Sequence, residues 1–292
     1  MTGAPSHARK PSFLCGLIGS GIHSSRTPPM HEREGDEQGF RLLYQKIDIA
    51  RLGVGADTLP ELLVAAERMG FAGLNITHPC KQAVIPLLHE LSSDAEALGA
   101  VNTVVLRDGK RIGHNTDWWG YAENFRRNMA DAPRRHVVQF GAGGAGSAVA
   151  YALMTSGVEN LTVVDVDRSR AETVAAGLCA RFGANRVKAG TEDAVAKADG
   201  VVNTTPLGMD RYPGMPLHAE LLRPDLWVSE IVYFPIETAL LRAARAAGCR
   251  TLDGGGMAVF QAVKAFELFT GTTPDAERML RHFAALGSGT TD

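Results

Sequence analysis

The sequence predicts a two-domain α/β protein whose second domain is built on a doubly wound parallel sheet. With 292 residues the chain exceeds the usual size of a single domain. From His136 onward, short apolar segments alternate with amphipathic ones, and this order of strand and helix is typical of parallel sheets. The 32 glycines fit the many tight turns that such a fold requires.

In the first half, apolar runs and turn residues predict strands joined by helices. Phe13–Gly19 is an apolar run that ends in glycine, as a buried strand does. Thr58 and Glu61 have the spacing of a capping box, and Asp108-Gly109 predicts a hairpin turn. We expect strands at 13–19, 42–48, 72–77, 100–106 and 111–114, with helices at 30–39, 58–70, 81–88 and from Ser92 or Ser93.

The second half is more regular. Ser169 and Glu172 form another capping box, and Gly157 and Gly248 stand where helices end. We expect strands at 136–140, 161–165, 187–189, 200–204 and 228–232. Two helices divided at Gly271 follow at 257–286, too late to extend the sheet, so we expect them to return to the first domain. The predicted domains are therefore 12–117 plus 257–292, and 118–256.

Composition argues against several classes of protein. Thirty basic and 32 acidic side chains leave a formal charge of −2 without a basic stripe, so no nucleic-acid partner is expected. Four cysteines without CxxC spacing, and histidines without ligand-pair spacing, argue for reduced thiols and against a metal. No apolar run approaches the roughly 20 residues that span a bilayer. We expect a soluble cytoplasmic protein without a signal peptide.

The glycine-rich turn after residue 140 has the features of a phosphate-binding loop. The strand 136–140 runs into Gly141-Ala142-Gly143-Gly144-Ala145-Gly146, where a helix begins. Glycines allow the tight turn and let the backbone approach a pyrophosphate, whose charge lies at the helix N-terminus. A turn without a ligand would gain nothing from so many glycines, because they weaken the start of the helix. We expect a dinucleotide here, in a Rossmann-type domain.

Asp165 indicates which dinucleotide binds. It ends the next strand, about twenty residues beyond the glycines, where a carboxylate accepts hydrogen bonds from the ribose hydroxyls. Asp167 adds a second carboxylate that would repel the 2′-phosphate of NADP. Arg168 and Arg170 complicate the choice, because a guanidinium pairs well with phosphate. We expect NAD rather than NADP.

Polar side chains follow the strand ends of the first half. Singly they have ordinary explanations, since Asn and Asp favour turns, Ser and Thr favour helix caps, and an exposed Lys is usually only solvated. The set comprises Ser24, Ser25, Thr27, Asn75, Thr77, Lys81, Asn102 and 115–117. Together with their motifs they resemble the shikimate/quinate dehydrogenase family over nearly the whole chain. The matching segments are SSRTPPMH, NITHPCK, GAVNT, GHNTDWWG, GAGGAG, NTTPLGM (203–209), VYFPIETALL (232–241) and DGGGMAVFQA (253–262).

The resemblance implies a role for each residue. Lys81, paired with Asp117, would exchange a proton with a secondary alcohol while hydride passes to the nicotinamide. Quinate or shikimate would be held by Ser25, Thr27, Thr77, Asn102, Tyr233 and Gln261. The dinucleotide would lie against Gly141, Ala142, Gly143, Gly144, Ala145, Asp165, Asp167, Arg170, Thr205, Pro206, Val232 and Gly254. The family includes monomers and homodimers, and both stay open.

Three departures from the family pattern matter. NADP-linked members typically carry Asn-Arg-Thr where this chain has Asp165-Val166-Asp167, which favours NAD. Thr27 stands where a serine is usual, as in quinate-accepting members, so quinate is expected alongside shikimate. Cys80 and Glu230 stand where Tyr and Asp are usual, and they leave the pocket lining near Lys81 open.

Three other functions compete with this interpretation. One is an NADP-linked biosynthetic shikimate dehydrogenase. Another is a methylene-folate dehydrogenase, against which the NTD motif and the Gln261 segment argue. The third is a catalytically silent NAD-binding regulator, which the presence of both Lys81 and Asp117 disfavours.

Overall fold

The computed structural model describes residues 10–288, which form two compact units. Unit 1 consists of the described residues up to Ser92, of Val101–His114, and of the described residues from Ala265 onward. Unit 2 consists of Ser93–Ala100 and Asn115–Lys264. The chain therefore divides at 114/115 and 264/265, where the sequence suggested 117/118 and 256/257, and the segment 93–100 falls in unit 2. No helix in the described part of the chain is long and apolar enough to cross a membrane.

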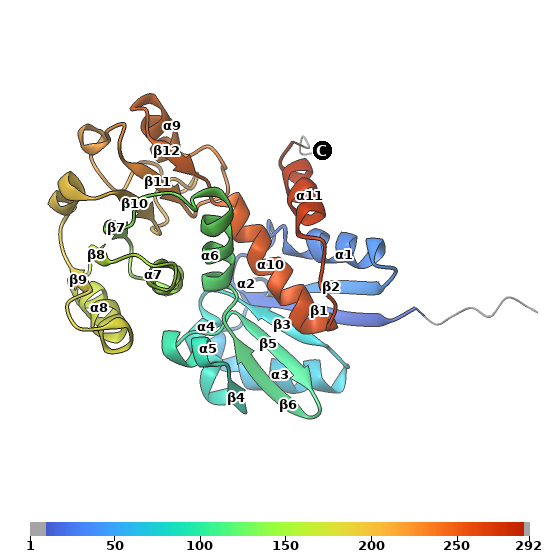
Figure 1. Cartoon of the computed structure of the whole chain (residues 1–292). Helices are drawn as coiled ribbons and strands as arrows, with labels where there is room; N and C mark the ends of the chain where they lie inside the picture. The colour runs from blue at the N-terminus through green and yellow to red at the C-terminus, as the bar shows by residue number, and fades with distance from the viewer. Residues whose placement is uncertain (1–9, 289–292) are drawn as a thin grey trace, which may run out of the picture. The chain divides into compact units, whose positions relative to one another are not determined.

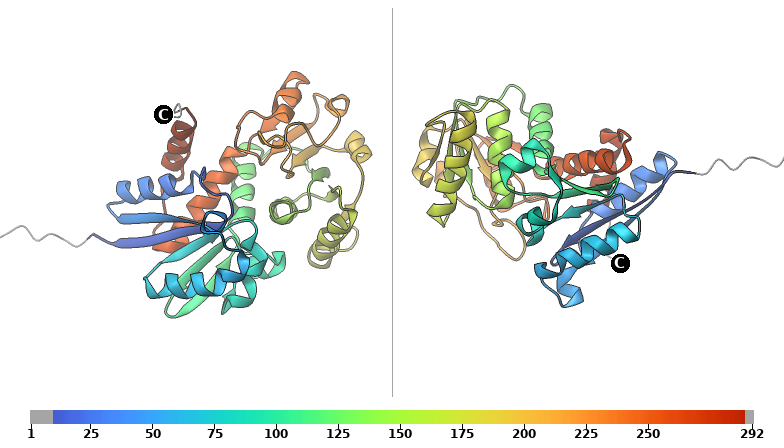
Figure 2. Two further views of the ribbon diagram at one scale, coloured as in Figure 1. Left: turned by 180° about the vertical axis from the view of Figure 1, so that it is seen from behind. Right: turned by 90° about the horizontal axis from the view of Figure 1, so that it is seen from below.

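Unit 1 is built on a mixed sheet of six strands. Its order is β2 (Arg41–Asp48), β1 (Ser12–Gly19), β3 (Gly73–Ile76), β5 (Thr103–Arg107), β6 (Lys110–His114) and β4 (Glu90–Leu91). β1 is parallel to β2 and β3, whereas β5 is antiparallel to β3 and β6. Helices α1 (Thr27–Glu37) and α3 (Leu59–Arg68) lie on opposite faces of this sheet, as Figures 1 and 2 show.

The core of unit 1 is completed by the last described part of the chain. Cys15 and Leu17 of β1 pack with Phe266 and Phe269, which lie near the end of α10 (Gly255–Thr270). The packing is close, because a Cβ at Gly73 would lie 2.3 Å from the Phe269 ring. α11 (Ala276–Ser288) follows and is tied to α1 by an ion pair of Arg278 with the buried Glu34, 2.6 Å apart.

His31 on α1 makes the stability of unit 1 sensitive to acid. Its ring is fully buried, 4.8 Å from the Tyr44 ring between centroids, and burial lowers the pKa of His31 to about 4. The pKa of His31 is higher in the unfolded chain, so protonation of the ring favours unfolding. The contribution of the neutral buried ring to stability is therefore present above about pH 6.5 and is lost as the pH falls through about 4. This difference corresponds to about 3 kcal/mol.

We expect that in His31→Leu the free energy of unfolding of unit 1 falls less between neutral and acid pH than it does in the wild type. Urea unfolding at pH 7 and pH 4.5, followed by a unit 1 probe, measures it. His23→Leu is the matched control, because His23 is exposed. Equal pH dependence in the His31 variant and the wild type would contradict the assignment.

Unit 2 is built on a fully parallel sheet of six strands, so the predicted doubly wound parallel sheet is confirmed with one strand more than the five expected. Its order is β12 (Arg250–Leu252), β11 (Trp227–Glu230), β10 (Gly200–Asn203), β7 (His136–Phe140), β8 (Asn160–Val164) and β9 (Val187–Ala189). Counted from β7, this is the doubly wound order 3-2-1-4-5-6, which places ligands at the carboxyl ends of the strands where the order reverses. Helices α7 (Gly144–Thr155) and α8 (Arg168–Phe182) lie side by side and share one apolar core (Figure 1).

The remaining elements are five α-helices and four 3₁₀ turns of the described residues. The α-helices are α2 (Ile49–Leu52), α4 (Cys80–Ala83), α5 (Ser93–Leu98), α6 (Asp117–Asn128) and α9 (Ala239–Ala246). The 3₁₀ turns are η1 (Ala56–Thr58), η2 (Ile85–Leu87), η3 (Glu192–Lys197) and η4 (Ala219–Leu221).

Several local predictions were wrong. Thr58 does not cap α3, because it already has helical dihedrals in η1 and its hydroxyl donates to the Gly55 carbonyl at 2.7 Å. Ser169 does not cap α8, because the carboxylate of Asp167 accepts the Ser169 amide at 3.1 Å. The helix expected at 81–88 is divided into α4 and η2 around Val84, ahead of Pro86. The sequence analysis also missed β4 and β12, which have two and three residues.

Candidate active site

Five predicted substrate-side residues gather at one edge of the unit 1 sheet. β1 and β3 are parallel neighbours, with Ile18 beside Ile76, so the segments that follow them leave the sheet together. The segment before β5 lies at the same edge, because β5 is antiparallel to β3. The five residues are Ser25, Thr27, Thr77, Lys81 and Asn102.

Backbone contacts fix the turn that carries Thr77 and Lys81. The Thr77 amide donates to the Ile18 carbonyl at 2.9 Å, and the Cys80 amide donates to the Thr77 carbonyl at 2.8 Å. A Cβ at Gly19 would lie 2.2 Å from Thr77 Cγ2, so only glycine lets the two strand ends approach this closely. Lys81 follows in α4, and its carbonyl accepts the Val101 amide at 3.0 Å. Hydrogen bonds therefore hold the backbone that carries the half-buried Lys81 side chain.

A buried polar network orients the Asn102 side chain. The Tyr44 hydroxyl donates to Asn75 Oδ1 at 2.5 Å, and Asn75 Nδ2 donates to Thr103 Oγ1 at 2.9 Å. The Thr103 hydroxyl in turn donates to Asn102 Oδ1 at 3.0 Å. All four residues are at most 6% exposed. Sequence reasoning missed Tyr44, although its place on the alternating buried face of β2 was a usable indication.

Unit 2 holds the other two predicted polar residues of the NTD and glutamine motifs. Asn115 Oδ1 accepts the Asp117 amide at 3.1 Å, while Asn115 Nδ2 donates to the Ala100 carbonyl at 3.0 Å. Asp117 is therefore held, largely buried, at the first turn of α6. Gln261 lies on α10, and a Cβ at Gly120 of α6 would lie 2.6 Å from the main-chain nitrogen of Gln261. That glycine lets α6 and α10 pack closely.

The glycine loop has the shape that its sequence predicts. Gly141 has a φ of 100°, and a Cβ there would lie 2.7 Å from Thr204 Oγ1, so the turn requires glycine. Gly143 and Gly144 are exposed at the start of α7, and a Cβ at Gly143 would meet nothing within 4 Å. Ala145 is half-buried and Ala142 is buried. The loop is therefore open at the N-terminus of α7, a helix of 12 residues, and this position suits a phosphate.

Two glycines of this loop give a matched pair of variants. We expect Gly143→Ala to fold as the wild type does but to weaken dinucleotide binding about tenfold, because the methyl group enters the phosphate position. Gly146→Ala should instead lower the free energy of unfolding by about 2 kcal/mol, because its Cβ would lie 2.4 Å from the Gly141 carbonyl oxygen. Thermal unfolding and dinucleotide titration measure the two effects. Unchanged binding in Gly143→Ala would refute the phosphate position.

Asp165 connects the glycine loop to the end of β8. Its Oδ2 accepts the Ala142 amide at 2.7 Å, and its Oδ1 accepts the Asp167 amide at 2.9 Å. Each carboxylate oxygen has a further lone pair, so the half-buried group can still accept from ribose hydroxyls. Val166 beside it is fully exposed.

The charged residues that follow Asp165 form ion pairs with neighbouring side chains. Asp167 caps α8 and accepts the Ser169 hydroxyl at 2.6 Å, which lowers the pKa of Asp167. Arg170 pairs with Asp167 at 3.3 Å, and Arg168 pairs with Glu172 at 2.8 Å. The structure therefore places Asp167 and Arg170 in a local helix cap, and both arginines already have carboxylate partners.

The remaining predicted cofactor residues follow β10, β11 and β12 at the same carboxyl edge. Thr205 and Pro206 follow Thr204 in the loop after β10. Buried Val232 follows β11, and next to it lies exposed Tyr233, which was predicted to bind the substrate. Gly254 follows β12, and a Cβ there would lie 2.5 Å from the Ile231 carbonyl oxygen. Gly254 therefore lets the segments after β11 and β12 touch.

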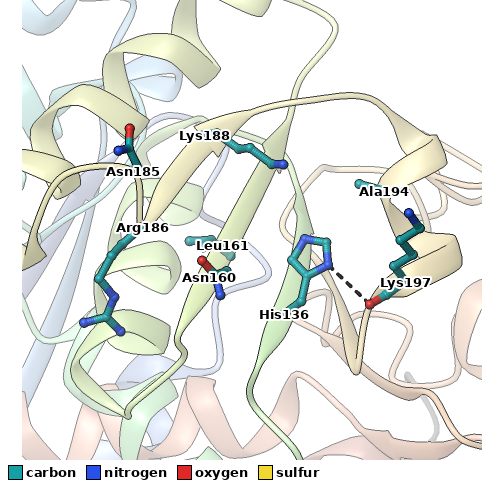
Figure 3. A pocket seen from close by; sticks show the side chains of 8 residues that line it. All are labelled: His136, Asn160, Leu161, Asn185, Arg186, Lys188, Ala194 and Lys197. Atoms are coloured by element: carbon teal, nitrogen blue, oxygen red, sulfur yellow. Dashed lines mark hydrogen bonds between the residues drawn. The ribbon is translucent and has the colours of Figure 1, made fainter.

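A pocket of about 340 Å³ in unit 2 is separate from this edge. It lies at the amino ends of β7, β8 and β9, where His136, Asn160 and Lys188 line it (Figure 3). The His136 ring already has partners, Thr162 Oγ1 at 2.9 Å and the Lys197 carbonyl at 3.4 Å. Ligands of doubly wound sheets bind at the carboxyl ends, so this pocket is not part of the candidate site.

Comparison with known proteins finds relatives that cover nearly the whole chain. The model of the shikimate dehydrogenase substrate binding domain matches residues 17–104, and that of the shikimate 5′-dehydrogenase C-terminal domain matches 254–282. Shikimate dehydrogenase (NADP(+)) of Streptomyces avermitilis is 57% identical over 279 residues, covering 94% of this chain and 96% of that protein. Quinate/shikimate dehydrogenase (NAD(+)) of Corynebacterium efficiens is 52% identical, with coverages of 94% and 99%. The structure of quinate dehydrogenase from Corynebacterium glutamicum in complex with NAD superposes with a TM-score of 0.90 at 50% identity, with coverages of 94% and 100%.

Proposed function

The chain belongs to the shikimate/quinate dehydrogenase family, and from this premise we propose that it oxidises quinate, shikimate or both to the 3-dehydro ketone with NAD as hydride acceptor. The protein is an oxidoreductase that acts on a secondary alcohol with a nicotinamide dinucleotide. We further propose that unit 1 binds the substrate and unit 2 the dinucleotide.

The choice of NAD rests on the loop after β8. Overall identity does not decide it, because NADP-linked and NAD-linked relatives are similarly close, at 57% and 52%. The observation that carries the proposal is the Asp165 carboxylate at the strand end, followed by the apolar Val166. A 2′-phosphate there would meet a negative charge, and the two nearby arginines are already paired with carboxylates.

The chemistry assigns one task to each polar group. Bound nicotinamide would accept the hydride, so the chain itself must take up the hydroxyl proton and hold the ring. Lys81 is proposed to accept that proton in oxidation and return it in reduction, assisted by Asp117. Hydroxyl and amide groups suit the carboxylate and ring hydroxyls of the substrate, and the proposed set is Ser25, Thr27, Thr77, Asn102, Tyr233 and Gln261. The additional methyl group of Thr27 favours acceptance of quinate.

One assay separates this function from its competitors. Purified protein is mixed with NAD or NADP and with quinate, shikimate or a methylene-folate, and reduced nicotinamide is followed by its absorbance. We expect reduction of NAD with quinate and shikimate, and a kcat/KM for NAD at least about tenfold above that for NADP. Preference for NADP would support the biosynthetic alternative. Dinucleotide binding without turnover of any acid would support the regulator.

A further inference from the structure

We propose that Glu230, the last residue of β11, is a positioning residue that holds together two loops of the dinucleotide site. One loop follows β10 (residues 204–209) and the other follows β11 (residues 231–238). The inference rests on the proposed function, because these loops carry Thr205, Pro206 and Val232. It adds a residue that touches neither ligand but decides where the groups that touch the dinucleotide are placed.

The Glu230 carboxyl group is buried and is held by neutral donors from the end of β10 and from the loop after β11. It is 1% exposed. Asn203 Nδ2 donates to its two oxygens at 2.9 and 3.0 Å. The Val232 amide donates to Oε1 at 3.0 Å, and the Thr238 hydroxyl donates to Oε2 at 3.1 Å. One side chain therefore fixes the end of β10 and both ends of the loop after β11.

Asn203 extends this connection into the loop after β10. Its Nδ2 also donates to the Leu207 carbonyl at 2.9 Å. Its Oδ1 accepts the amide and the hydroxyl of Thr205, at 3.0 and 2.7 Å. The Thr205 hydroxyl accepts the Leu207 amide at 3.1 Å. A change at Glu230 can therefore reach Thr205 through Asn203.

Thr238 anchors the other loop and brings it against the first. Its hydroxyl caps α9 by accepting the Leu241 amide at 3.3 Å, so the loop ends at a fixed helix start. A Cβ at Gly208 would lie 3.2 Å from Thr238 Cβ, and Gly208 has a φ of 108°. The two loops therefore touch beside the carboxyl group that connects them.

The energetics indicate that this carboxyl group serves geometry. A buried carboxyl group is costly unless it is paired, and an apolar side chain of similar size is often at least as stable. The groups that face Glu230 are Asn203, Thr238 and main-chain amides, all neutral, and burial raises the pKa of Glu230 to about 7. What a leucine could not supply is the set of directed hydrogen bonds.

The strand order indicates which half of the dinucleotide is affected. Asp165 follows β8, on one side of β7, whereas β10 and β11 lie on the other side of β7. A doubly wound sheet binds one mononucleotide half on each side of that point. With the adenosine ribose at Asp165, the loops held by Glu230 meet the nicotinamide half. ADP-ribose, which lacks nicotinamide, is therefore a discriminating probe.

The test compares the affinity of purified variants for NAD and for ADP-ribose by calorimetric titration. We expect Glu230→Leu to bind NAD about tenfold more weakly and ADP-ribose within twofold of the wild type. Glu230→Gln keeps the shape and the acceptor oxygen, and should recover NAD binding to within about threefold. Glu237→Gln is the matched control, since Glu237 lies in the same loop but pairs with Arg245 at the surface.

Each outcome decides the proposal. Equal losses for NAD and ADP-ribose, or no loss for either, would overturn it. If Glu230→Leu fails to fold, Thr238→Val keeps the carboxyl group but removes one of its donors together with the cap of α9, and a loss of about threefold confined to NAD is expected. Binding is measured without turnover, so a wild type that binds NAD but oxidises neither acid would refute the proposed function and leave this inference testable.

Discussion

Replacement of Lys81 by alanine is expected to lower kcat by about 10³-fold or more while the affinity for NAD stays within twofold of the wild type. The lysine is proposed to act on the reacting hydroxyl and so contributes in the transition state. Its half-buried side chain leaves little cavity when truncated, and the backbone bond from Val101 to its carbonyl remains. Steady-state kinetics with quinate and shikimate, together with NAD titration, measure both quantities.

A second lysine of the same unit provides the control for this experiment. Lys110 on β6 is exposed and pairs with Glu90, so Lys110→Ala should keep wild-type kcat. Turnover of Lys81→Ala within tenfold of the wild type would show that another group takes the proton. Loss of NAD affinity in that variant would show that residue 81 serves the cofactor and not the alcohol.

Replacement of Asp165 by asparagine is expected to reduce the preference for NAD over NADP about 30-fold. Two charges 4 Å apart interact by about 4 kcal/mol near a protein surface. Asp165 is half-exposed, so solvent screening reduces this to about 2 kcal/mol, which corresponds to the stated factor. The measurement is kcat/KM for each dinucleotide at saturating quinate or shikimate.

Two further variants test the reason for that preference. Asp167→Asn keeps the cap of α8, because asparagine caps helices as well as aspartate does. Asp167 is already bonded to Ser169 and Arg170, so this variant should change the ratio less than about threefold. Adding Val166→Arg to Asp165→Asn should favour NADP further, because Val166 is fully exposed and an arginine there can reach a phosphate. If the ratio of kcat/KM for NAD to that for NADP is unchanged in all three variants, Asp165 does not bind the ribose.

The sequence was sufficient for the parallel sheet of unit 2 but not for its edge. Strands such as β7 and β10 are buried on both faces, so they appear as apolar runs. β12, at the edge of the sheet, has three residues of which two are polar, so it contains no apolar run. Helix starts were also misjudged, since Asp167, nearer the strand, caps α8 in place of Ser169.

The same distinction explains which parts of the site were predictable. The glycine loop is contiguous in sequence, and Asp165 follows it at a fixed interval. The connection of Tyr44 to Asn75 joins strands 31 positions apart through the register of β2, β1 and β3, which no local pattern encodes. The connection of Glu230 to Asn203 likewise depends on β10 and β11 being neighbours. Roles for Lys81 and Gln261 came from the family resemblance.

The dependence of the unit 1 core on Phe266 and Phe269 has a consequence for synthesis on the ribosome. Strands β1 to β6 emerge about 150 residues before these two rings, because Val101–His114 precedes the whole of Asn115–Lys264. At typical elongation rates this is a delay of about 10 to 30 seconds. During it the face of β1 and β3 that those rings will cover stays open, so the domain that is translated first is completed last. Chains that end after Lys264 should therefore be captured by chaperones through unit 1 while unit 2 already resists proteolysis.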